Sequence, residues 1–195
     1  MKTKNITILT LGAVMLACFV TGCSTSKQRS VAARPLMGSN TVVVDLKKYE
    51  VVSVVPFTEP VNKDPADPGG AGERLATDVA ARLSNDFGKL FHQVRLAPPE
   101  GKTNELVVTG CIRTYIPGSR VGRLFMIGVT PSVLKGDLVL KDAASQKELF
   151  SGPFDKLWAW GGVLGAGKGI TEMMTESAAS IAATIARGKG WTPSK

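Results

Sequence analysis

Short apolar runs rich in valine mark the first strands that the sequence predicts. Residues Thr41 to Leu46 and Glu50 to Phe57 form two such runs, separated by a pair of lysines. Runs of this length are typical of strands, and the near absence of polar alternation in EVVSVVPF indicates a strand buried on both faces. The same criteria predict strands at Gln93 to Ala97 and at Glu105 to Tyr115. They predict a short strand or loop edge within Gly118 to Lys135. A hairpin is expected next, with strands at Gly136 to Lys141 and Glu148 to Phe150 on either side of a turn at 142–146.

Two other segments repeat with the period of a helix. Leu75, Val79 and Leu83 recur every four residues after a loop rich in Pro and Gly, and they predict an amphipathic helix that ends near Gly88. A second helix is expected to open at Thr171, with Gly188 beyond its end. The apolar face of this second helix consists of Met174, Ala178, Ile181, Ala182 and Ile185.

This order of strands and helices predicts an α/β fold, with α+β as the alternative. We expect a single domain over 41–188, built as a mixed β-sheet with the two helices packed on it, and a loose tail over 189–195. The chain of 195 residues is long enough to bury one hydrophobic core.

The first apolar run of the chain is too short for a membrane-spanning helix. Two lysines precede the run at 6–20, and Val20-Thr21-Gly22-Cys23 closes it. A spanning helix needs roughly 20 apolar residues, whereas the core of a signal peptide needs about 7–15. The run therefore predicts a signal peptide over 1–22. An uncleaved anchor and an ordinary secretory signal are the alternatives.

The end of this segment resembles the lipobox of bacterial lipoproteins. The resemblance implies cleavage between Gly22 and Cys23 and attachment of diacylglycerol and palmitate chains to Cys23, which anchor a protein stably. Ser24, in place of Asp, implies the outer membrane, with the domain facing the periplasm. Residues 23–40 are polar and rich in Ser, so we expect a flexible tether between the lipid and the domain.

The charge balance narrows the partners that such a protein meets. The chain carries 24 basic and 16 acidic residues, a formal net charge of +8. Outside the cytoplasm the acidic partners are anionic lipids and cell-wall polymers, so we expect no binding of nucleic acid. The basic residues are scattered along the sequence, which favours a solvated surface over one binding patch.

The sequence offers few residues for catalysis. His92 is the only histidine, and we expect it at the surface or in a helix cap. Once Cys18 is removed with the signal peptide and Cys23 is lipidated, Cys111 is alone in an oxidising compartment, and its apolar neighbours favour a buried, inert thiol. We therefore expect no nucleophilic triad, no metal site and no cofactor, and a protein that is not an enzyme.

A glycine-rich segment near the C-terminus is the main candidate for contact with a partner. Its residues are Trp158, Trp160, Gly161, Gly165 and Gly169. Small residues spaced by four allow close packing, and tryptophan suits an amphipathic interface. The alternative is a glycine loop leading into the last helix, with both tryptophans packed on the core. The segment also nearly matches a phosphate-binding loop, but it lacks the Ser or Thr that would hold magnesium, so we expect no nucleotide.

A second apolar segment, Leu124 to Ile127, lies beside two arginines. It predicts either a contact with a membrane or partner, or a buried strand.

The segments VVPF, LVVTGCI, PGSR and GDLVLKDAASQKELF resemble a family of bacterial lipoproteins defined only as a domain of unknown function (4410-type). The resemblance covers about Val51 to Arg187. More distantly, the opening strand, loop, helix and strand are similar to the periplasmic α/β domain of curli-secretion lipoproteins and of outer-membrane activators of cell-wall synthases. These resemblances imply a mixed sheet with helices packed on it, and no particular activity.

The sequence thus favours a non-enzymatic outer-membrane lipoprotein whose periplasmic domain binds an envelope protein. A subunit of an oligomeric secretion or envelope channel is the first alternative, and a cell-envelope hydrolase is the second.

Overall fold

The computed structural model describes residues 44–59, 70–118, 131–158 and 169–192. The predicted signal peptide, the Gly22–Cys23 cleavage site and the tether lie outside these residues, as do Leu124 to Ile127, Trp160, Gly161 and Gly165. The backbone of Trp158 is described, and its side chain is not. None of the helices formed by the described residues has the length and apolar character needed to cross a membrane.

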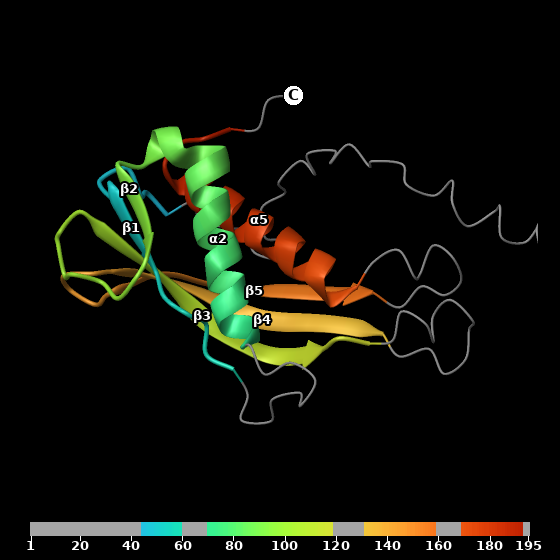
Figure 1. The fold of residues 1–195 in the computed structure, drawn as a ribbon. Helices are drawn as coiled ribbons and strands as arrows, with labels where there is room; N and C mark the ends of the chain where they lie inside the picture. Colours follow the sequence, from blue (N-terminus) through green and yellow to red (C-terminus); the bar gives the residue numbers. More distant parts are fainter. Residues whose placement is uncertain (1–43, 60–69, 119–130, 159–168, 193–195) are drawn as a thin grey trace, which may run out of the picture. The chain divides into compact units, whose positions relative to one another are not determined.

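Five strands form one open sheet in the order β2-β1-β3-β4-β5 (Figure 1). They are β1 (Val51–Val54), β2 (Gln93–Leu96), β3 (Glu105–Ile116), β4 (Ser132–Asp142) and β5 (Glu148–Trp158). β1 pairs in parallel with β2 and β3, whereas β3, β4 and β5 are antiparallel neighbours. All four residues of β1 are buried, as its unbroken apolar run predicted.

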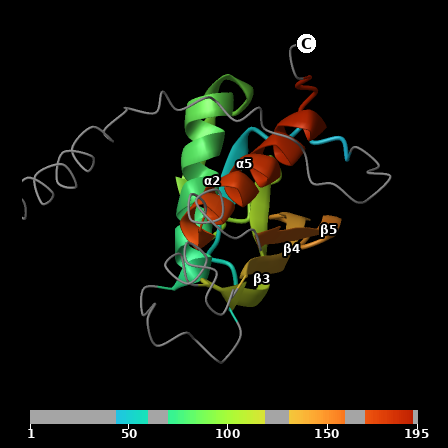
Figure 2. The same ribbon diagram turned by 90° about the vertical axis from the view of Figure 1, so that its right-hand side faces the viewer.

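Two long helices, α2 (Ala71–Phe87) and α5 (Ile170–Gly188), cover the same face of the sheet (Figures 1 and 2). A short 3-10 helix, η1 (Gly88–Leu90), follows α2. Leu75, Val79 and Leu83 are fully buried, so the four-residue period identified the buried face of α2 correctly. The predicted apolar face of α5 is buried as well. The predicted α/β domain, a mixed sheet with two helices on it, is therefore confirmed.

The segment before β1 is irregular where a strand was predicted. Of the predicted strand over 41–46, residues 44–46 are described, and they have no regular secondary structure. The Leu46 N–H donates a hydrogen bond to the carbonyl of Gly188 (2.9 Å), and the Leu46 side chain is buried. These apolar residues close the C-terminal end of α5 instead of extending the sheet.

The predicted hairpin forms around residues 142–146, but its strands are longer than expected. β4 and β5 each contain 11 residues, and β4 begins within the stretch 118–135. The predicted strands began at Gly136 and ended at Phe150, whereas the observed strands continue past Gly136 on one side and past Gly152 and Pro153 on the other, although such residues usually interrupt strands. In the structure a Cβ on Gly136 would lie 2.3 Å from the Phe154 ring, and one on Gly152 would lie 2.8 Å from the Phe150 ring. The two glycines therefore make room for aromatic side chains within the sheet.

The residues after α5 are held against the domain. The Lys189 ammonium donates to the carbonyls of Lys47 (3.0 Å) and Tyr49 (2.8 Å). The Trp191 ring meets the Phe87 ring edge-on, with centroids 5.1 Å apart. A loose tail was expected from Lys189 onward, and among the described residues Lys189 and Trp191 are instead packed.

Candidate functional site

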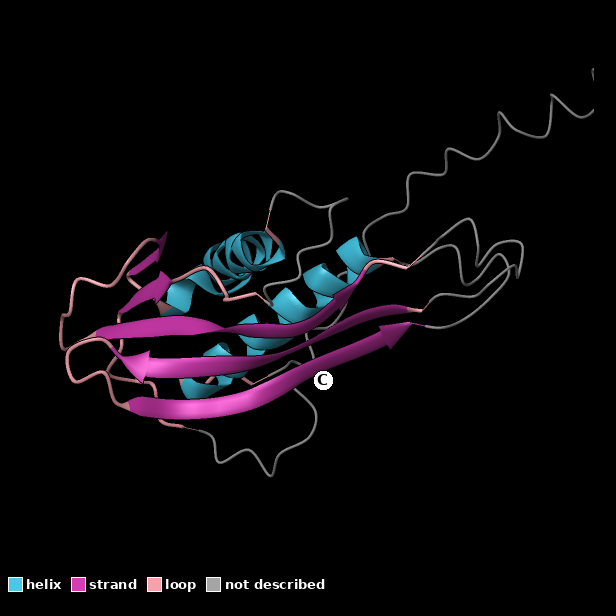
Figure 3. Ribbon diagram, turned by 90° about the horizontal axis from the view of Figure 1, so that it is seen from below, coloured by secondary structure: helices cyan, strands magenta, loops and turns pink. Residues whose placement is uncertain are grey.

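The three long strands turn one face to the helices and leave the other uncovered by any described element (Figure 3). Along β4, Leu134, Leu138 and Leu140 are fully buried on the helix side, and Lys135 and Val139 alternate with them as exposed or half-buried residues. We call this uncovered side of β3, β4 and β5 the open face. Its residues include Thr109, Cys111, Arg113, Thr114, Ile116, Val133, Lys135, Asp137, Val139, Ser151, Pro153, Asp155 and Leu157.

The centre of the open face carries ion pairs that join all three strands. Arg113 lies 2.9 Å from an Asp137 carboxylate oxygen and 3.2 Å from an Asp155 carboxylate oxygen. These side chains are between a third and a half exposed, so each pair contributes at most about 1 kcal/mol. The Cys111 thiol lies 3.6 Å from an Asp137 carboxylate oxygen and is half-buried, so the prediction of a buried thiol is wrong.

One end of the open face is apolar. Ile116, Val133 and Leu157 lie in register on adjacent strands, and we call these three residues the apolar end. Ile116 is 43% exposed and Leu157 is 64% exposed, whereas Val133 between them is buried. The neighbouring row, Tyr115 and Leu134, packs against the core on the helix side. The apolar end therefore faces away from the core.

A buried carboxylate, Glu105, lies at the start of β3 and pairs with Arg95. Glu105 is fully buried and accepts hydrogen bonds from the Ser53 hydroxyl, the Arg95 guanidinium and the backbone N–H groups of Glu100 and Lys102. Burial alone raises the pKa of Glu105, but these hydrogen bonds outweigh it and lower the pKa to about 2. A carboxylate that stays ionised with its lone pairs occupied cannot act as a general acid or base, so its role is to tie β1, β2 and β3 together.

A second carboxylate organises the turn between β4 and β5. Asp142 accepts hydrogen bonds from the Ser145 backbone N–H (2.9 Å), the Tyr49 hydroxyl (2.8 Å) and the Lys48 ammonium (3.1 Å). These hydrogen bonds hold the pKa of Asp142 well below its ordinary value. The aspartate therefore shapes the turn and fastens it to the segment before β1.

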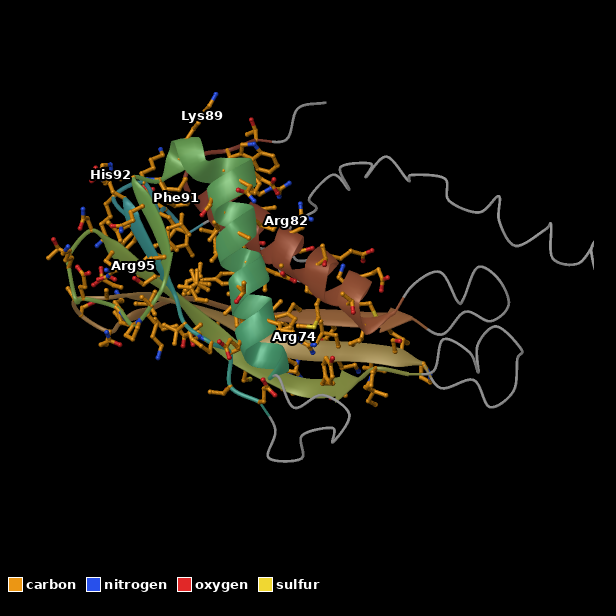
Figure 4. The ribbon with its side chains drawn as sticks, viewed as in Figure 1. Arg74, Arg82, Lys89, Phe91, His92 and Arg95 are labelled. Carbon is orange, nitrogen blue, oxygen red and sulfur yellow. The ribbon has the colours of Figure 1, made fainter. Side chains whose placement is uncertain are left out.

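Two further features lie near the end of α2 (Figure 4). His92 is exposed after η1, which agrees with the predicted surface position. A hollow of about 500 Å³ is lined by Ser84, Asn85, Asp86, Phe87, Gly88, Lys89, Leu90 and Trp191. Most of these side chains are exposed, unlike the enclosed apolar lining of a ligand site.

No model of a known family matches the chain, and no curated protein matches it by sequence. Solved structures share its fold. Two structures of PelC dodecamers from Paraburkholderia phytofirmans, one of them a variant, align with TM-scores of 0.51 and sequence identities of 18% and 16%. The alignments cover 71% and 72% of this chain and 87% and 90% of the PelC chains. A lipoprotein from Neisseria meningitidis aligns more weakly, with a TM-score of 0.35 and 15% identity over 59% of this chain and 83% of that chain.

The chain thus has a PelC-like fold. At sequence identities of 18% and 16%, the similarity to PelC establishes a shared fold and nothing about function. Membership of the chain in the 4410-type family therefore stays a prediction.

Of the predicted contact residues, only Gly169 and the backbone of Trp158 lie within the described part of the chain, so the predicted contact stays a prediction. Gly169 is buried at the start of α5, where its N–H donates to the Glu172 carboxylate (2.8 Å). The backbone of Trp158 ends β5, one residue beyond the apolar end. Among the described residues, no three His, Cys, Asp or Glu side chains lie close enough to hold a metal ion.

Sequence reasoning missed the open face and the Glu105 cluster. The alternation LKGDLVLKD in β4 was a usable signal for a strand with one polar face. Nothing local marked Glu105, because its partners come from β1, from β2 and from the loop before β3.

Proposed function

We propose that the protein is a non-enzymatic lipoprotein of the cell envelope, anchored through Cys23 in the outer membrane, whose periplasmic domain assembles with further copies of itself. Membership of the 4410-type family of lipoproteins is part of this proposal. The open face is the observation that supports self-assembly, because a three-stranded surface left uncovered by the described residues offers room for a protein partner. The PelC structures of the same fold are dodecamers, which favours a second copy of this chain as that partner.

The dimensions of the open face suit an interface. Three strands spaced about 4.8 Å apart and about 35 Å long cover roughly 500 Å² before side-chain relief is counted. A stable interface buries roughly 800 Å² on each partner, so the open face supplies much of one side.

Contact through the strand edges is less favourable than contact through the open face. β5 is an edge strand and contains Pro153, which has no N–H to donate to an added strand. At the other edge, β2 has only four residues. Short edges and prolines oppose pairing between chains, so assembly through the open face is the better supported geometry.

Asp155→Arg tests this assembly. The substitution places a second positive charge beside Arg113 on the open face. We expect it to weaken the association between copies by at least about tenfold, so that the discrete ring-sized species of the wild type dissociates. Multi-angle light scattering of the detergent-solubilised protein measures the mass. Asp86→Arg is the matched control, since Asp86 is also an exposed aspartate paired with one arginine, but on α2. A wild-type monomer would contradict self-assembly and favour a different envelope partner.

Cys23→Ser tests the anchor. Loss of the thiol is expected to abolish incorporation of labelled palmitate in growing cells, because the acyl chains have no other attachment point in this scheme. Cys18→Ser is the control and should leave labelling unchanged. Undiminished labelling of the Cys23→Ser variant would refute the anchor.

A further inference from the structure

Three segments distant in the sequence meet at the end of the domain where α2 and α5 both finish. They are residues 44–50, 88–92 and 186–192. The Lys189 ammonium donates to the Lys47 carbonyl (3.0 Å) and lies 5.5 Å from the centre of the Phe91 ring, which Figure 4 shows beyond the end of α2. Lys89 and Trp191 line the same hollow. The three segments therefore form one surface, and we call it the basic end.

The basic end carries an excess of positive charge. Its acidic residues are Asp45 and Glu50, and its basic residues are Lys47, Lys48, Lys89, Arg187 and Lys189. The described residues as a whole carry equal numbers of basic and acidic side chains, so the rest of the described domain has an excess of negative charge. Two aspartates that border the basic end, Asp86 and Asp142, are paired with Arg82 and Lys48. The fold therefore gathers basic residues that are scattered in the sequence.

Trp191 gives the basic end an aromatic side chain suited to the boundary of a bilayer. It is half-buried, with its ring edge-on to the Phe87 ring. Tryptophan is enriched where proteins meet the headgroup region, because its ring is largely apolar and its N–H is polar. Lysines near the same surface attract anionic lipids. Lysine and tryptophan together thus match the chemistry of an anionic bilayer surface.

The tether joins the domain at the basic end. Val44 is the first described residue, and the Leu46 N–H donates to the Gly188 carbonyl (2.9 Å). The flexible tether predicted between Cys23 and the domain has an r.m.s. span of about 25 Å. β4 and β5, whose turn is fastened to Lys48, extend about 35 Å away from this end. A lipid on Cys23 therefore keeps the basic end closer to the bilayer than the opposite end of the sheet.

A second copy of the chain is the other candidate occupant. Two basic ends that met would bring like charges together, and like charges repel. The basic end could instead meet an acidic surface of the next copy, but Asp137 and Asp155 on the open face are already paired with Arg113. An anionic bilayer supplies unpaired negative charge and lies within reach of the tether. Charge complementarity and the position of the tether thus both favour the bilayer.

We propose that the basic end lies against the surface of an anionic phospholipid bilayer, with Lys47 and Lys89 toward the phosphate groups and Trp191 at the boundary of the acyl chains. This orientation rests on the proposed anchor at Cys23, which holds the domain close to the membrane. It directs the opposite end of the sheet away from the lipid and leaves the open face available to further copies.

Fluorescence quenching by brominated lipids tests this orientation in the full lipidated protein. Trp158→Phe and Trp160→Phe leave Trp191 as the single tryptophan, so the emission reports on the basic end. The protein is reconstituted into vesicles of brominated phosphatidylglycerol and, separately, of brominated phosphatidylcholine. We expect strong quenching in the anionic vesicles at about 0.1 M salt, and at least about threefold less in the zwitterionic vesicles or at about 1 M salt, where charges are screened beyond about 3 Å.

In the same background, Lys47→Glu and Lys89→Glu should each reduce quenching in the anionic vesicles by at least about threefold, because a carboxylate is repelled by the lipid surface. Both lysines are exposed, so we expect the variants to fold, and near-ultraviolet circular dichroism checks this. Lys156→Glu is the control, since it makes the same change of charge near the opposite end of β5. The control should quench like its parent.

Quenching that is unchanged by salt or by the two glutamate variants would overturn the orientation, as would an absence of quenching in protein that still co-floats with the vesicles at 1 M salt. Co-flotation at this salt concentration reports the anchor separately, and its loss would refute the anchor and the orientation together. The orientation would also be overturned if Lys47→Glu or Lys89→Glu dissociated the solubilised oligomer, because the basic end would then be an interface between copies.

Discussion

Glu105→Ala is expected to lower the free energy of unfolding by about 3–5 kcal/mol, a large part of the stability of an ordinary domain. Glu105 is fully buried and accepts hydrogen bonds from Ser53, Arg95 and two backbone N–H groups. Its removal takes this acceptor from the Ser53 hydroxyl and from both backbone N–H groups, and it leaves Arg95, only 17% exposed, with the more exposed Glu100 as its carboxylate partner. Urea denaturation followed by circular dichroism measures the change.

Glu100→Ala is the control for this prediction. Glu100 also pairs with Arg95, but its side chain is 47% exposed, and we expect its removal to cost less than about 1 kcal/mol. Similar losses in the two variants would show that burial does not decide the effect, and the interpretation of the cluster would be wrong.

The same carboxylate makes stability depend on pH. The pKa of Glu105 is lowered in the folded protein to about 2 from an ordinary value of 4.5. Because the unfolded chain takes up the proton first as the pH falls, the stabilisation is complete above about pH 4.5 and is lost between there and about pH 2. Glu105→Gln, which does not titrate, should lack this part of the acid dependence when unfolding is measured at pH 6 and at pH 3.

Gly136→Ala is expected to lower the free energy of unfolding by about 2–4 kcal/mol. A Cβ at this position would lie 2.3 Å from the Phe154 ring and 2.3 Å from the Cys111 carbonyl oxygen. Neither atom can withdraw easily, since Phe154 is buried against Phe57 with ring centroids 5.9 Å apart and the carbonyl belongs to the sheet. Overpacking of a core costs about 1–3 kcal/mol, and loss of an aromatic pair adds about 0.5–1.5 kcal/mol.

Gly88→Ala provides the comparison for this substitution. Its Cβ would meet nothing within 4 Å, and its φ of −56° suits any residue, so stability should change by less than about 1 kcal/mol. Thermal unfolding of the two variants side by side measures the difference. If Gly136→Ala unfolds at the wild-type temperature, the close approach of Phe154 is not a constraint on the fold.

Local patterns were sufficient for the helices and the first three strands. α2 begins and ends near the residues predicted from Leu75, Val79 and Leu83, because an apolar side chain every third or fourth residue can be buried only by a helix. The strands β1, β2 and β3 follow from short apolar runs in the same way. The helix boundaries and the burial of both faces of β1 needed no knowledge of distant residues.

The last two strands show where local patterns mislead. The predicted strands began at Gly136 and ended before Gly152, yet both glycines lie within the sheet, and each makes room for an aromatic ring that is packed next to it only after the sheet forms. In the same way, Leu46 was expected in a strand but closes the end of α5. The partner that decides each residue's conformation is distant in the chain or on another strand, and no local window contains it.

The sequence by itself determined the α/β class, the two helices and the residues that face the core, because burial of apolar side chains follows a local period. It is also the sole source of the predicted lipid anchor at Cys23. Only the tertiary structure decided that Arg113, Asp137 and Asp155 meet on one face, that Glu105 is buried with Arg95, and that Ile116 lies in one row with Leu157. These groupings depend on strand order and register, which are set by pairing between residues far apart in the chain.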